Sequence, residues 1–68
     1  MAVDVQRLEL GDVVLIDLDD GSGEVEAKVT RPIERADGTV RVSLRAEGRE
    51  ELVKEWKLGD QVTVVRGP

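Results

Sequence analysis

The residue types that carry most enzyme and metal chemistry are scarce in this chain. It contains no histidine and no cysteine, which excludes histidine general bases, thiol nucleophiles, disulfides and zinc fingers. The remaining hydroxyl nucleophiles, and the lysines that could assist them, are Ser22, Ser43, Thr30, Thr39, Thr63, Lys28, Lys54 and Lys57. None stands in a nucleophile-elbow or Ser-x-x-Lys pattern. Because a domain this small offers no deep pocket for tuning a pKa, we expect no enzyme activity and no cofactor.

An acidic tract over residues 17–24 reads Asp-Leu-Asp-Asp-Gly-Ser-Gly-Glu. Counted from Asp17 as a calcium loop, glycine falls at the fifth place instead of the sixth, and Lys28 takes the twelfth place, where a bidentate glutamate belongs. The spacing therefore predicts a solvated loop tip and no metal site. A weak cation site assisted by backbone carbonyls is the minority alternative.

Charge is distributed unevenly along the chain. The formal net charge is -5 and the pI is about 4.6, which opposes generic attraction to phosphate backbones or membranes. Residues 1–26 nevertheless carry a net charge of -7 and residues 27–49 a net charge of +3. The candidate nucleic-acid-binding residues of the basic part are Arg31, Arg35, Arg41 and Arg45. Since Trp56 is the only aromatic residue, bases would find no stacking platform, and nucleic-acid binding is the alternative function.

Apolar residues also occur where polar ones are expected. Val13 and Leu15 fall on the outward face of the first predicted strand, and Val3 and Val5 lie in the N-terminal arm. Either the arm folds back as an extra strand and covers Val13 and Leu15, or these residues form an exposed patch that binds a protein. The leading functional prediction is a non-catalytic interaction module that binds another protein, or a second copy of itself, through Val3, Val5, Val13 and Leu15.

The elements that must position these residues are short strands. Twelve valines favour strands, because the branched Cβ suits a pleated surface. Apolar residues alternate with polar ones in five segments, which span residues 13–18, 24–33, 39–45, 52–53 and 61–66. This spacing predicts one all-β domain over residues 1–68, a five- to six-stranded antiparallel barrel with residues 1–8 as an arm or extra strand. A short 3₁₀ turn is expected over residues 54–58, before the last strand.

One hairpin can be assigned in detail. Asp37-Gly38 predicts a two-residue type I′ turn, which would pair Glu34 with Arg41, Lys28 with Glu47 and Glu26 with Arg49. A four-residue loop would instead set Lys28 against Arg45 and Glu26 against Glu47, so the charges favour the shorter loop. That register turns Arg31 inward, and we expect an edge or bulge at Pro32 to release it to solvent.

Two stretches of the chain echo each other. Residues 8–12 read Leu-Glu-Leu-Gly-Asp and residues 56–60 read Trp-Lys-Leu-Gly-Asp, and each precedes an apolar strand. A duplicated binding element is one interpretation. We favour a local one, in which glycine makes a turn and aspartate caps it.

The order of elements resembles the small Src-homology-3-like barrels, which include the tudor and KOW modules. The matching parts are residues 10–16, the loop 21–25, two strands hinged at Asp37-Gly38, a short fourth strand, a turn at 56–58 and a closing strand. The resemblance implies the barrel fold. In KOW modules the loop after strand one carries lysine and glycines that meet RNA, whereas Asp19 and Asp20 stand here. The aromatic residues with which other members bind methylated side chains or proline-rich peptides are absent.

The expected cellular location rests on two sequence patterns that the chain does not show. No apolar run approaches membrane-spanning length, and residues 1–6 show no basic-then-apolar signal pattern. We therefore expect a soluble cytoplasmic protein, with one domain of a longer chain as the alternative.

Overall fold

The structure, a computed structural model, describes residues 1–18, 21 and 23–68. Its elements are β1 (Ala2–Asp4), the 3₁₀ helix η1 (Val5–Arg7), β2 (Val13–Asp17), β3 (Glu24–Val29), β4 (Glu34–Ala36), β5 (Thr39–Ala46), β6 (Leu52–Lys57) and β7 (Gln61–Arg66). The all-β prediction is confirmed, with seven strands instead of five or six. The part of the chain that the structure describes contains no helix long and apolar enough to cross a membrane.

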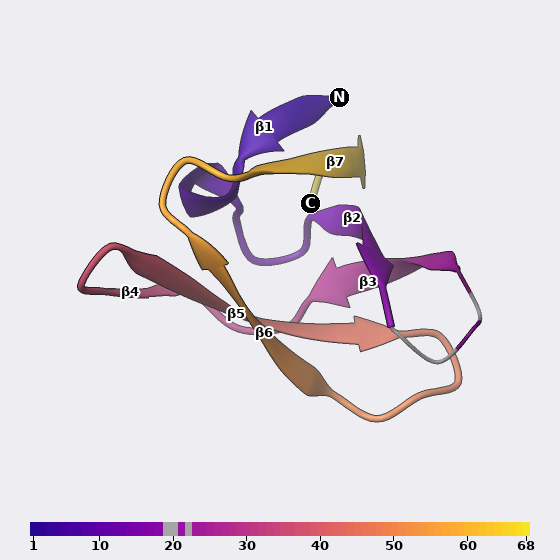
Figure 1. The fold of residues 1–68 in the computed structure, drawn as a ribbon. Coiled ribbons are helices and arrows are strands. Elements are labelled where there is room, and N and C mark those ends of the chain that lie inside the picture. Colours follow the sequence, from indigo (N-terminus) through magenta and orange to yellow (C-terminus); the bar gives the residue numbers. More distant parts are fainter. Residues whose placement is uncertain (19–20, 22) are drawn as a thin grey trace.

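All strands belong to one antiparallel sheet that curls into a half-barrel (Figure 1). The order is β1-β7-β2-β3-β5-β4, and β6 pairs with the other side of β5. β3 and β4 both pair with one side of β5, so they act as a single strand interrupted at residues 30–33. Relative to the five predicted segments, the two additional strands are thus β1 in the arm and β4, which is one half of this interrupted strand.

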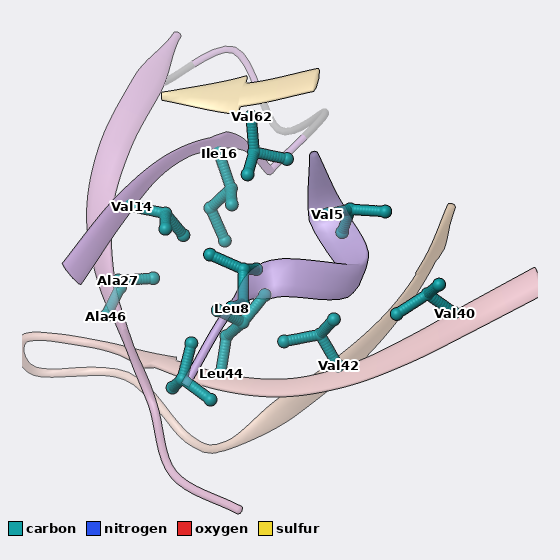
Figure 2. Packing of buried hydrophobic residues seen from close by; sticks show 11 residues of the cluster. Val5, Leu8, Val14, Ile16, Ala27, Val40, Val42, Leu44, Ala46 and Val62 are labelled. Atoms are coloured by element: carbon teal, nitrogen blue, oxygen red, sulfur yellow. The ribbon is translucent and has the colours of Figure 1, made fainter. Parts of the chain in front are cut away.

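The inner face of the curl is filled almost entirely by valine and leucine. Val14, Val29, Val40, Val42 and Leu44 are fully buried. Figure 2 shows side chains from the arm, β2, β5 and β7 pointing toward one another inside the curve of the sheet. With branched side chains in place of aromatic rings, the core needs contributions from nearly every element.

The N-terminal arm is part of this core. β1 pairs with β7 and places Val3 opposite Val62, on the inner face. The 3₁₀ helix then turns the chain inward, so that Val5 is fully buried and Leu8 is 4% exposed. The arm therefore forms the predicted extra strand, but it packs into the core and does not cover the outward face of the first predicted strand.

The 3₁₀ helix is not where the sequence pattern placed it. The segment expected to form that turn, residues 54–58, lies mostly in β6, which pairs with β5 from Leu52 to Lys57. Its inward residues Leu52, Lys54 and Trp56 are half-buried. Because the β5 ladder satisfies the backbone of this segment, it stays extended, and the 3₁₀ helix forms in the arm instead.

The hairpin at Asp37-Gly38 is confirmed, and its register is confirmed only near the turn. Asp37 and Gly38 have φ values of 49° and 80°, as a type I′ turn requires, and Glu34 pairs with Arg41. Further along, Lys28 pairs with Arg45 and not with Glu47. Lys28 and Glu34 are six positions apart while their partners are four apart, so the predicted bulge near Pro32 absorbs two residues. Arg31 is exposed there, as expected.

The two Leu-Gly-Asp stretches form the same turn. The Asp12 carboxylate accepts the Glu9 backbone N–H at 2.9 Å, and the Asp60 carboxylate accepts the Lys57 N–H at 2.9 Å. The glycine between them, Gly11 or Gly59, has a φ of 93° in both turns. The geometry supports the local interpretation, in which glycine turns the chain and aspartate caps the turn.

Substituting these glycines tests their conformational role. Gly59→Ala should lower the free energy of unfolding by about 1–2 kcal/mol, because a Cβ is strained at positive φ. Gly11→Ala should cost more, because its Cβ would also meet the Pro68 Cβ at 3.0 Å. Gly67→Ala is the control, since no atom lies within 4 Å of its Cβ position and Gly67 lacks a positive φ. Urea denaturation measures all three, and equal stability of the Gly59 and Gly67 variants would contradict the prediction.

Candidate functional site

The outer face of the sheet carries a row of residues that crosses four strands. Val13 on β2 pairs with Lys28 on β3 and with Arg66 on β7, and Lys28 pairs in turn with Arg45 on β5. Directly opposed residues share one face of a sheet. At Arg66, where the register shifts beside Val13, the ion pair with the outward Glu26 places the side chain on this face. Three cations and one valine therefore stand side by side, and we call Arg66, Val13, Lys28 and Arg45 the cationic row.

The cationic row lines an open groove of 780 Å³. Leu10, which is 55% exposed, lies on the groove within the first Leu-Gly-Asp turn, and Glu26 and Glu47 add two carboxylates. The side chains that line the groove carry a net charge of +1 in a chain whose net charge is -5. The groove thus combines local positive charge with apolar surface.

The predicted protein-binding residues are divided between the core and this groove. Val5 is fully buried and Val3 packs against the core, so neither belongs to an exposed patch, and that part of the prediction is wrong. Val13 is outside the central core cluster but only 7% exposed, because the apolar stems of Lys28 and Arg66 flank it. Leu15 is half-buried between Glu26 and Thr63.

The contact between Lys28 and Arg45 is electrostatically unfavourable. Like charges directly opposed across two strands destabilise a sheet by roughly 0.2–1 kcal/mol. Arg66 is balanced by Glu26 at 3.3 Å, and Arg45 donates to the Arg49 carbonyl at 3.1 Å. The Lys28 side chain makes no hydrogen bond or ion pair with any other residue that the structure describes. Its ammonium group is therefore available to an anionic group from outside.

The four arginines proposed for nucleic-acid binding do not form one free stripe. Arg41 and Arg45 share the outer face of β5, whereas Arg35 pairs with the inward-facing Val40 and donates to the Gln6 carbonyl at 3.3 Å. Arg31 lies in the bulge. Arg31 bonds to Glu51 at 3.3 Å and Arg41 to Glu55 at 3.1 Å, so each of the four has an acceptor within the chain.

One hydroxyl has a carboxylate partner. The Thr30 hydroxyl donates to Glu51 at 2.6 Å. This hydrogen bond is the largest cause that lowers the pKa of Glu51 from its ordinary value of 4.5; burial opposes it, and the Arg31 and Arg45 guanidinium groups lower the pKa further. A carboxylate with a lowered pKa is a weaker base, so the pair resembles a structural anchor for the bulge more than an activated nucleophile.

The acidic tract is described only at its ends. Asp17 and Glu24 are exposed and oppose each other across β2 and β3, and the central residues Asp19, Asp20 and Ser22 lie outside the described residues. Among the described residues no group of three or more candidate metal ligands occurs. The minority cation site therefore stays a prediction.

Sequence reasoning missed the groove as a unit. The alternation predicts that Glu26 and Lys28 face outward, but it does not single out Arg66. It assigns Leu10 only to a turn. The pairing of Lys28 with Arg45 does follow from the four-residue alternative for the hairpin loop. The sequence could not show that a two-residue bulge produces this pairing together with a two-residue turn.

Replacing Lys28 tests the electrostatic cost of the row. Lys28→Gln should raise the free energy of unfolding slightly, and Lys28→Glu should raise it by about 0.5 kcal/mol at low salt, because a glutamate would attract both Arg45 and Arg66. High salt should shrink the gain. Urea melts at two salt concentrations measure the series, and a Lys28→Glu variant less stable than the parent would show that the three cations do not repel one another.

Glu51 gives the chain a defined acid response. Because its folded-state pKa is lowered, its ionised form contributes stability above the ordinary pKa of 4.5, and this contribution is lost as the pH falls through the lower folded value. Thr30→Val should raise the Glu51 pKa by removing the largest cause of the shift. Carboxyl-carbon NMR titration measures it, with Thr63→Val as the control, and an unchanged midpoint in Thr30→Val would refute the assignment.

Comparison with known proteins places the chain in no family: no family model matches it, and no curated protein or solved structure is significantly similar to it.

Proposed function

We propose that the chain is a small non-catalytic interaction module that binds another protein through the outer face of β2 and the groove beside it. The single observation that carries the proposal is the groove itself, which joins the exposed Leu10 to the positive charge of Lys28, a residue whose side chain has no partner among the described residues. Apolar surface rimmed by polar groups is typical of protein-binding sites. Membership of the Src-homology-3-like class and a cytoplasmic location stay predictions that accompany this proposal.

The absence of catalysis is part of the proposal. Where a described hydroxyl group has a hydrogen-bond partner, the contact supports the fold. The Thr39 hydroxyl, for example, donates to the Ala36 carbonyl at 2.6 Å. Lys54 donates to the Asp17 carbonyl at 2.7 Å and so tethers β6 to the end of β2. These contacts favour roles in holding the half-barrel together over roles in chemistry.

Nucleic-acid binding ranks second. The cationic row favours it, because three cations cross the sheet in line. Against it, Glu26 and Glu47 line the same groove and would repel the successive charges of a phosphate backbone. Three arginines outside the groove, Arg31, Arg35 and Arg41, are also engaged within the chain.

Two leucines in equivalent turns give a matched test. Leu10 and Leu58 are 55% and 51% exposed and precede the glycine of the same turn type, but only Leu10 lines the groove. Used as baits for affinity capture, the parent and Leu58→Asn should retain the same protein partners, and Leu10→Asn should lose them. Thermal melts establish that both variants are folded. Capture that is unaffected by Leu10→Asn would reject the groove as the binding surface, and concentration-dependent mass in light scattering would identify a second copy as the partner.

A further inference from the structure

We infer that the groove recognises a short acidic segment of a partner protein, with a carboxylate placed between Lys28 and Arg45 and a neighbouring apolar side chain against Leu10. This inference rests on the proposed function and specifies the chemistry of the partner. The class of ligand is a peptide in which one or two glutamates or aspartates stand beside apolar residues.

The position of the carboxylate follows from the pairing of β3 with β5. Lys28 and Arg45 are directly opposed, so their side chains lie near enough for one anionic group to contact both. Arg66 already has Glu26, and Lys28 has no partner among the described residues. A carboxylate at this point would turn a repulsive pair into two charge-assisted hydrogen bonds.

The apolar part of the ligand follows from the groove wall. Leu10 projects from its turn with 55% of its surface exposed, whereas Val13 is already buried. A leucine or valine next to the carboxylate could remove the exposed surface of Leu10 from water, at about 25 cal/mol for each Å² buried. Phosphates of a nucleic acid have no equivalent group to place here.

Charge also limits the length of the segment and disfavours a second copy. The whole chain carries a net charge of -5, so two copies repel each other, as would a long acidic tail. At physiological ionic strength the repulsion is screened beyond about 8 Å. A segment with one or two carboxylates therefore experiences mainly the local net charge of the groove, which is positive.

The test uses NMR titration of the full chain with a capped six-residue peptide that carries two glutamates between leucines. Its glutamine counterpart and a short single-stranded RNA are titrated in parallel. The glutamate peptide should shift the amides of Lys28, Arg45 and Leu10. The Lys28→Gln, Arg45→Gln double variant should bind it about tenfold more weakly. The control is Arg41→Gln with Lys57→Gln, which removes the same charge from the outer face of β5 and β6, outside the groove, and should bind like the parent.

Each other outcome overturns the inference. Equal binding of the glutamine peptide at the groove would show that acidity is not recognised, while the groove would remain an interaction surface. Binding of RNA but not of the peptide would assign the row to phosphate. Absence of any peptide-induced shift would reject acidic recognition, and whether the groove binds a protein would still be decided separately by the Leu10→Asn capture.

Discussion

The register of β3 against β5 is the constraint on which the rest of the outer surface depends. An unbroken ladder from the Asp37-Gly38 turn would place Arg31 inward against Leu44, and an unpaired buried charge costs several kcal/mol. The bulge at residues 30–33 removes Arg31 to solvent and brings Val29 opposite Leu44 in the core. The accompanying charge mismatch costs about 1 kcal/mol at most, so burial decides the register and the Lys28–Arg45 pair is its consequence.

The burial of apolar residues decides the register of β3 against β5 because the hydrophobic core of this domain is small. A domain of this length buries about 60% of the surface of its unfolded chain, and this one must fill its interior almost without aromatic rings. The arm compensates by supplying Val5 and Leu8 to the cluster, and the Val5 N–H donates to the Asp60 carbonyl at 2.8 Å. The arm is thereby anchored to the second Leu-Gly-Asp turn, and β1 and β7 are also joined through Met1 and Val64.

A feature of the structure could be predicted from the sequence when the residues that cause it lie close to it in the chain. Alternation and turn residues act within a few positions, and so they predicted the all-β fold, the Asp37-Gly38 turn and the two aspartate-capped turns. The 3₁₀ helix was misplaced because residues 54–58 are decided by pairing with β5, which lies a dozen residues away. The groove was missed for the same reason: Val13, Lys28, Arg45 and Arg66 come from four strands, and only the register unites them.

The distribution of ion pairs explains why the groove differs from the rest of the outer surface. On β5 and in the bulge at residues 30–33, Arg41 and Arg31 face glutamates that balance them, as expected for a surface that only has to remain solvated. In the groove, Lys28 stands between Arg45 and Val13, with Arg66 beyond the valine. Such an arrangement lowers the stability of the free chain, and proteins commonly retain it where stability is traded for binding. A partner that places a carboxylate between Lys28 and Arg45 would therefore bind more tightly, because it would relieve a repulsion that destabilises the free chain.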